Sequence, residues 1–278
     1  DVGYHGSEFS TPNIDRIARE GVELDRFYGT PICTPTRAGL MTGRYPIRFG
    51  IQRVTIKRWG KRAITEGEVL VPGGLAKAGY KTRAMIGKWH LGWAKREYHP
   101  MSRGFTSFYG LGGGAIGYFA LGQFDIRDWH RDWLESPDQG YSTTLIGREA
   151  ARIIDGSAKG EPFFLYVAFN AIHSPNDYEP AQYERFSHIQ DEKRRQLAAM
   201  TASLDAEIGR ILNTLERKGM SDDTLIWFLC DNGGVMTDGP SSYPLRDGKW
   251  SVYDGGIRLA SAVRWPNGLD PGRKLSEP

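Results

Sequence analysis

Residues 31–44 have the sequence Pro-Ile-Cys-Thr-Pro-Thr-Arg-Ala-Gly-Leu-Met-Thr-Gly-Arg. Pro35 suits the first turn of a helix, because the N–H that proline lacks would have no partner there. Cys33 is therefore expected at a helix N-terminus, where free N–H groups and the helix dipole favour negative charge. Arg37 lies about one turn further on and can reach back toward the same point. The segment predicts either a small buried cysteine or a nucleophile in an anion-binding cradle.

The segments around this helix alternate between helical and strand patterns. Helices are predicted at residues 11–18, 75–77, 141–154 and 190–218, and strands at 22–28, 80–87, 162–169, 224–230 and 259–263. The apolar runs at 162–169 and 224–230 are typical of strands that are buried on both faces. Alternating buried strands and helices indicate an α/β fold with a mostly parallel sheet.

Polar side chains follow several of the predicted strands. They are Lys88, His90, His173, Asp231 and Asn232, and Asp1 would follow a strand lost from the N-terminus. In α/β sheets, functional sites form beyond the carboxyl ends of the strands. We therefore expect one edge of one sheet to gather these groups.

The chemistry of these residues favours an oxyanion site. Carboxylate and amide oxygens suit Ca²⁺ or Mg²⁺ rather than zinc, although a single Asp after a strand is more often a helix cap. The histidines are candidate acids and bases, and each alone is more often structural. The cations are Arg37, Lys88 and Lys249. Cations, a metal and a helix N-terminus together predict a site for a tetrahedral oxyanion such as sulfate or phosphate.

The composition excludes several classes of protein. The chain has 278 residues, of which 40% are hydrophobic and 25% charged, and its net charge is +3. These values are ordinary for a globular protein, and the charge suits an anionic substrate but is too small to indicate nucleic acid. No apolar run is long enough to span a membrane. Two cysteines, Cys33 and Cys230, do not indicate a redox compartment.

Residues 93–140 have no clean periodicity and combine glycines with aromatic residues. A stretch of this length is either disordered or functional, and its aromatic content argues against disorder. We expect either a rim over a site or an irregular layer on the core. As a rim, its tyrosines and tryptophans would stack on sugar faces, and Trp250 beside Lys249 would do the same.

The segment 33–37, Cys-Thr-Pro-Thr-Arg, followed by Thr42-Gly43-Arg44, resembles the signature of the type I sulfatases. Other stretches resemble further motifs of that family in order: residues 1–4, 11–15, 87–92, 173–175, 231–234, 248–250 and 255–258. Residues 141–143, 189–191 and 244–251 are similar to the arylsulfatase B (N-acetylgalactosamine-4-sulfatase) branch. Two features depart from the family: the first Asp of its Asp-Asp metal motif is absent, and Cys230 stands where Ser or Thr is common.

The resemblance implies an alkaline-phosphatase-like sandwich with a large mixed, mostly parallel sheet flanked by helices. It implies sulfate ester hydrolysis through a formylglycine that is made by oxidation of Cys33. The implied cofactor is Ca²⁺, with Mg²⁺ possible, held by Asp1, Asp231 and Asn232. The implied catalytic residues are Cys33, Arg37, Lys88, His90, His173 and Lys249, and the implied substrate-binding residues are Lys88, His173, Lys249 and Trp250.

In the implied reaction the aldehyde hydrates to a geminal diol. One hydroxyl attacks sulfur, and the second later expels sulfate by re-forming the aldehyde. Arg37 and Lys88 would hold the diol, while Lys249 would bind the sulfate. His173 would also bind the sulfate and protonate the leaving oxygen, and His90 would be the base that triggers elimination.

The whole chain, residues 1–278, is expected to form one sulfatase catalytic domain, without the first strand and the smaller C-terminal domain of the family. The resemblance implies a secreted, periplasmic or lysosomal protein, with a signal segment outside this chain. The implied partners are a sulfated carbohydrate or aryl sulfate and a formylglycine-generating or anaerobic maturase enzyme. Two alternatives stay open: a phosphate or phosphonate ester hydrolase of the same superfamily, and a catalytically silent glycan-binding homologue with an unmodified Cys33.

Overall fold

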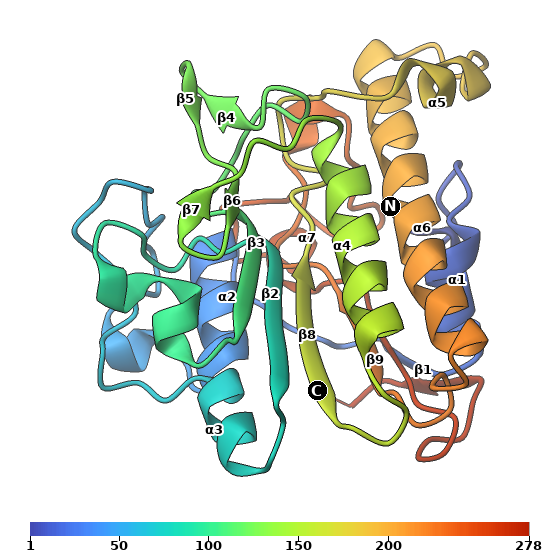
Figure 1. Ribbon diagram of the computed structural model, residues 1–278. Helices are drawn as coiled ribbons and strands as arrows, with labels where there is room; N and C mark the ends of the chain where they lie inside the picture. The colour runs from blue at the N-terminus through green and yellow to red at the C-terminus, as the bar shows by residue number, and fades with distance from the viewer. Residues whose placement is uncertain (278) are drawn as a thin grey trace. The chain divides into compact units, whose positions relative to one another are not determined.

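The computed structural model describes residues 1–277, so residue 278 of the expected catalytic domain lies outside the described residues. The chain divides into two compact units, and Figure 1 labels many of their helices and strands. Unit 1 comprises residues 1–32 and the described residues from 178 onward, and unit 2 comprises Cys33–Asp177. In residues 1–277, no helix is both long and apolar enough to cross a membrane.

Unit 2 is built on a five-stranded mixed sheet with the strand order β7-β6-β3-β2-β8. Its strands are β2 (Thr82–Lys88), β3 (Ser107–Leu111), β6 (His130–Arg131), β7 (Leu134–Glu135) and β8 (Phe163–Ala168). β2 runs parallel to β3 and to β8, and β6 and β7 continue the sheet antiparallel. A separate hairpin joins β4 (Gly122–Gln123) to β5 (Ile126–Arg127). The parallel pairs therefore centre on β2.

Helices of unit 2 flank this sheet. They are α2 (Cys33–Thr42), α3 (Val71–Lys77) and α4 (Ser142–Gly156), with short 3₁₀ helices at Pro46–Phe49, Arg96–Tyr98 and Pro100–Arg103. α4 packs against β2, β3 and β8. α2 places Ala38 and Met41 in a hydrophobic cluster with Met85 of β2 and Phe108 of β3. This packing fixes the start of α2 beside the end of β2.

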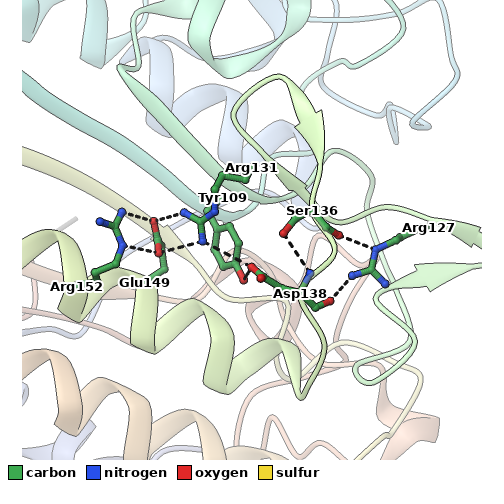
Figure 2. Close-up of polar contacts among 7 residues, drawn as sticks. All are labelled: Tyr109, Arg127, Arg131, Ser136, Asp138, Glu149 and Arg152. Atoms are coloured by element: carbon green, nitrogen blue, oxygen red, sulfur yellow. Dashed lines mark hydrogen bonds and ion pairs between the residues drawn. The ribbon is translucent and has the colours of Figure 1, made fainter.

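The segment 93–140 is both a layer on the core and a source of exposed aromatic rings. Tyr118 and Trp129 are fully buried, whereas half of Phe119 is exposed. Figure 2 shows the polar network that ties the segment down. The Tyr109 hydroxyl of β3 donates to Asp138 at 2.6 Å. In the same network Glu149 of α4 accepts hydrogen bonds from Arg131 of β6 and from Arg152.

Unit 1 contains a four-stranded sheet with the order β11-β1-β10-β9. The strands are β1 (Val22–Leu24), β9 (Ile226–Leu229), β10 (Ser261–Arg264) and β11 (Arg273–Leu275). β1 is antiparallel to β10 and parallel to β11, and β10 is antiparallel to β9. This sheet is therefore mostly antiparallel.

The helices of unit 1 are α1 (Pro12–Arg19), α5 (Pro180–Arg185), α6 (Glu192–Arg217) and α7 (Asp254–Ile257), with 3₁₀ helices at Gly3–His5 and Met236–Asp238. Thr11 precedes α1, but its side chain makes no capping hydrogen bond. Asp205 of α6 caps α1 instead, because its carboxylate accepts hydrogen bonds from the N–H groups of Asn13 and Ile14. Burial raises the pKa of Asp205 even though these hydrogen bonds lower it. A long-range contact thus caps α1.

The α/β class and most predicted elements are confirmed, with four differences. The predicted strands lie in two sheets, because β9 pairs antiparallel with β10 and not with β8. The side chains of β8 and β9 are mostly half-buried, so the prediction of strands buried on both faces is wrong. The strand predicted at 22–28 ends at Leu24. The sequence patterns missed β3 and β11, which are short and lie among glycines or charged residues.

Candidate active site

Cys33 is the first residue of α2, as its neighbouring prolines predict. Its side chain is a free thiol and only 4% of the residue is exposed. The thiol sulfur lies 3.3 Å from Nδ1 of His90. Next to it, the Thr34 hydroxyl donates to the His90 carbonyl and accepts from the N–H of Ile56, both at 3.3 Å. The start of α2 is thus fastened to the segment that follows β2.

Two buried cations lie in the same part of unit 2. Arg37 and Lys88 are 6% and 2% exposed. Nη1 of Arg37 donates to the carbonyl of Lys88 at 2.7 Å and contacts the Tyr166 hydroxyl of β8 at 3.4 Å. Arg37 therefore reaches from one turn inside α2 to the end of β2. Buried cations interact strongly with anions, because water screens them little.

His90 follows β2 with a left-handed backbone conformation (φ 59°). Only 2% of the residue is exposed, and its N–H donates to the carbonyl of Gly112 at 3.2 Å. A non-glycine residue in this conformation is uncommon and marks a position that the surroundings determine. The turn that follows β3 therefore helps to fix His90.

His173 follows β8 and is half-buried. Its Nδ1 lies 2.7 Å from the carbonyl oxygen of Ser174. Because a carbonyl oxygen only accepts, Nδ1 carries hydrogen and Nε2 is the nitrogen that gains or loses a proton. The Tyr118 hydroxyl donates to the carbonyls of His173, at 2.8 Å, and Asn170, at 3.1 Å. Burial raises the pKa of Tyr118 well above its ordinary value, so it remains a donor.

Unit 1 holds the oxygen donors that the sequence suggests as metal ligands. Asp1 accepts from Arg194 and from the N–H of Ser241, each at 2.7 Å. Asp231 and Asn232 follow β9, and Asn232 donates through Nδ2 to the carbonyl of Gly233. The buried Oδ1 of Asn232 has no hydrogen-bond partner within residues 1–277.

This donor set fits a hard divalent cation. An orphaned buried amide oxygen is costly unless something binds it, and a cation of this class would do so. Each carboxylate oxygen of Asp1 accepts one hydrogen bond and keeps a second lone pair. The part of the chain that the structure describes contains no cluster of three or more His, Cys, Asp or Glu side chains that would hold a metal.

Lys249 and Trp250 lie in a tightly packed loop of unit 1. The N–H of Lys249 donates to the carbonyl of Gly234 at 2.9 Å, and that of Trp250 donates to the carbonyl of Pro31 at 2.8 Å. Gly248 has no room for a Cβ, which would lie 2.3 Å from the Gly234 oxygen. Trp250 has φ 72°, and 64% of it is exposed. The loop thus holds an exposed indole in a strained backbone conformation.

The predicted residues divide between the two units. Unit 2 contains Cys33, Arg37, Lys88, His90 and His173, and unit 1 contains Asp1, Asp231, Asn232, Lys249 and Trp250. Within unit 2, the structure brings Cys33 to His90 and Arg37 to Lys88.

The sequence patterns missed two tyrosines that support these groups. Tyr166 belongs to an apolar run that predicts only a strand, and Tyr118 to the aperiodic aromatic segment. Their hydroxyls reach Arg37 and the backbone of His173. A hydroxyl inside an otherwise apolar run is the one signal in the sequence that suggests a polar partner for Tyr166.

Comparisons with known proteins show the family of the chain. The family model named Sulfatase matches residues 1–277. Mouse arylsulfatase J is 36% identical over 96% of this chain and 46% of its own length. Human N-acetylgalactosamine-6-sulfatase is 32% identical over 98% of the chain and 56% of its own length. The chain thus spans about half the length of these relatives.

A solved structure shares the fold along the whole chain. It is the crystal structure of Ps i-CgsB in complex with k-i-k-neocarrahexaose, with a TM-score of 0.93 and 33% identity, and the match covers 100% of this chain and 65% of that one. The expected α/β fold of the alkaline-phosphatase-like class is thereby confirmed. The family match and these similarities show that the chain belongs to the sulfatase family.

Proposed function

We propose that this protein hydrolyses sulfate esters with a nucleophile derived from Cys33. The observation that carries the proposal is the contact between the thiol of Cys33 and Nδ1 of His90, 3.3 Å apart at a helix N-terminus. Arg37 and Lys88, both buried, add positive charge in the same unit. Transfer of an oxyanion group requires a nucleophile, a base and cations. Here α2 and the end of β2 supply all three.

In this proposal, formylglycine made from Cys33 supplies a hydrated aldehyde as the nucleophile. Arg37 and Lys88 hold its hydroxyl groups: both residues are buried, and the Arg37 guanidinium donates to the Lys88 carbonyl at the end of β2. His90 takes the proton whose loss releases sulfate, because its Nδ1 faces the side chain of residue 33.

His173 and Lys249 bind the sulfate in the proposed reaction. The Nδ1 hydrogen of His173 is held by the Ser174 carbonyl, and Nε2 is the ring nitrogen that would protonate the leaving oxygen. Lys249 supplies a positive charge against the charge that develops on the sulfate. The Tyr118 hydroxyl orients His173 by donating a hydrogen bond to the backbone carbonyl of His173.

Asp1, Asp231 and Asn232 would hold a divalent cation, which we propose to be Ca²⁺ rather than Mg²⁺. Bound there, the cation would supply Lewis-acid polarisation of the sulfate ester. The support from this chain is the hard oxygen donor set and the orphaned Oδ1 of Asn232.

We propose a sulfated sugar or glycan as the substrate. The exposed indole of Trp250 offers a stacking face next to Lys249, whose ammonium lies 5.5 Å from the indole centroid. Trp250→Ala is expected to lower kcat/KM on a sulfated oligosaccharide about tenfold and to leave a small aryl sulfate unchanged. Tyr45→Ala removes another exposed aromatic ring, in unit 2, and serves as the control. Equal losses on both substrates would contradict a stacking role.

The remaining partners follow from the proposed chemistry. A formylglycine-generating or anaerobic maturase enzyme would act on Cys33. A secreted, periplasmic or lysosomal location would place the enzyme where sulfated glycans occur.

A pair of aryl esters tests the proposed reaction. The protein is assayed on an aryl sulfate and on the aryl phosphate with the same leaving group, beside Cys33→Ala. The proposal requires faster turnover of the sulfate, and loss of that turnover in the variant. A preference for the phosphate would favour the phosphate or phosphonate hydrolase alternative.

A further inference from the structure

Gly114 lies against the imidazole of His90. A Cβ at residue 114 would lie 2.5 Å from Nε2 and 2.6 Å from Cε1 of that ring. These distances are below any normal contact, and the ring of His90 has little freedom because only 2% of the residue is exposed. Glycine is therefore the one residue that allows the turn to approach the ring this closely.

The turn that contains Gly114 is fastened by a buried carboxylate. Asp128, which is 4% exposed, accepts from the N–H of Gly112 at 3.1 Å and from that of Gly113 at 2.8 Å. Arg58 and His130 face the same carboxylate at 3.3 and 3.1 Å. Burial would raise the pKa of Asp128, but these hydrogen bonds and the Arg58 charge outweigh it and hold the pKa below its ordinary value.

The turn also contacts the backbone of His90. The carbonyl of Gly112 accepts from the His90 N–H at 3.2 Å. Residues 112–114 thus contact His90 at its main chain and at the Nε2–Cε1 edge of its ring. Nδ1 of the same ring is the atom 3.3 Å from the thiol of Cys33.

We propose that residues 112–114, anchored by Asp128, position the imidazole of His90 against residue 33. Gly114 and Asp128 are the positioning residues, and neither touches the reacting atoms. The effect of these residues on turnover rests on the proposed sulfatase reaction, whereas their effect on the position of the His90 imidazole does not. A shift of the ring by about 1 Å is enough to cost roughly 10²-fold in rate.

Gly114→Ala tests the proposal, with Gly117→Ala as the matched control. The added methyl group at 114 pushes on the ring, whereas at 117 the nearest atom is the Ala120 Cβ at 3.3 Å. We expect Gly114→Ala to lower kcat on an aryl sulfate about 10²-fold with KM within about twofold. The control should keep kcat within about twofold. Unchanged kcat in Gly114→Ala would overturn the proposal.

A double-mutant cycle separates positioning from general damage. If residue 114 acts through the ring, Gly114→Ala in a His90→Ala background costs less than about threefold more. A loss of kcat in the His90→Ala background as large as in the wild-type background would overturn the proposal.

Substitutions of Asp128 test the anchor of the turn. Asp128→Asn keeps one hydrogen-bond acceptor for the turn and should lower kcat about tenfold, and Asp128→Ala should lower kcat further. Equal kcat in Asp128→Asn, Asp128→Ala and wild type would also contradict the proposal.

Crystal structures of the variants give a readout that does not depend on turnover. The variants for this comparison are made in a host that leaves Cys33 as a thiol. In Gly114→Ala, or in Asp128→Asn if the first variant does not fold, the separation of the Cys33 sulfur from His90 Nδ1 should exceed 3.3 Å. An unmoved ring would overturn the positioning role even in an active enzyme. A moved ring in a protein without sulfatase activity would support positioning and contradict the proposed function.

Discussion

Cys33 combines burial, a helix N-terminus and a histidine nitrogen 3.3 Å from its sulfur. The same geometry would suit a thiolate nucleophile, since a helix N-terminus favours negative charge. The buried cations Arg37 and Lys88 instead suit an anionic group that is larger than a thiolate. At this scale the structure supports Cys33 as the precursor of the reactive group.

Lys249→Ala is expected to reduce turnover of a small aryl sulfate roughly 10²–10³-fold, because one donor to the developing oxyanion is lost. Steady-state kinetics measure this change. Lys77→Ala, at the exposed end of α3, is the control and should leave the rate unchanged. Near wild-type turnover in Lys249→Ala would contradict its role.

His99 makes stability depend on pH. Burial lowers the pKa of His99 from 6.5 to about 4, and its Nδ1 accepts from the N–H of Met101, which only the neutral ring can do. The unfolded chain therefore binds a proton first, so stability present above pH 6.5 is lost as pH falls toward 4. The loss is expected to reach about 3 kcal/mol. Urea unfolding of wild type and His99→Gln at several pH values measures it, and parallel pH profiles would count against this explanation.

At the scale of elements, the sequence predicts whether a segment forms a helix or a strand better than it predicts which strands pair. Prolines and spacing predict α2 at Cys33, and the apolar run predicts β8. They do not predict β3, in which Gly110 interrupts the pattern at φ 145°. They also do not predict that β9 pairs with β10, because partner choice depends on contacts far apart in the chain.

The cap of α1 by Asp205 is such a long-range contact. Asp205→Ala is expected to cost about 2 kcal/mol of unfolding free energy, at the upper end for a lost cap, because buried N–H groups lose their acceptor. Asp191→Ala removes the local cap of α6 and is the comparison, with an expected cost of about 1 kcal/mol. Chemical denaturation measures both. A smaller loss for Asp205→Ala than for Asp191→Ala would contradict this view of α1.

At the scale of the whole molecule, the ordered motifs predict the family and the candidate residues. They do so because the chemistry requires particular side chains after particular strands. The sequence could not reveal Gly114 or Asp128, whose roles arise from the approach of one turn to one ring. The division into two units is likewise a property of contacts rather than of composition.

Cation binding should be visible in the unfolding of the whole protein. Ca²⁺ at about a hundred times its Kd stabilises the folded state by about 2.7 kcal/mol, which raises Tm by several degrees relative to EDTA. Asn232→Ala should remove most of this increase. Asn267→Ala, an exposed asparagine in the same unit, should keep it. The same increase in Asn232→Ala as in wild type would exclude Asn232 as a ligand.

The mass of the peptide that contains Cys33, from protein made in its native host, tests the central claim most directly. The account predicts the aldehyde, which is lighter than the thiol because the sulfur is replaced by a carbonyl oxygen. It predicts the thiol mass for the Cys230 peptide, the internal control. An unmodified thiol at Cys33 would contradict the sulfatase mechanism and favour a silent glycan-binding protein.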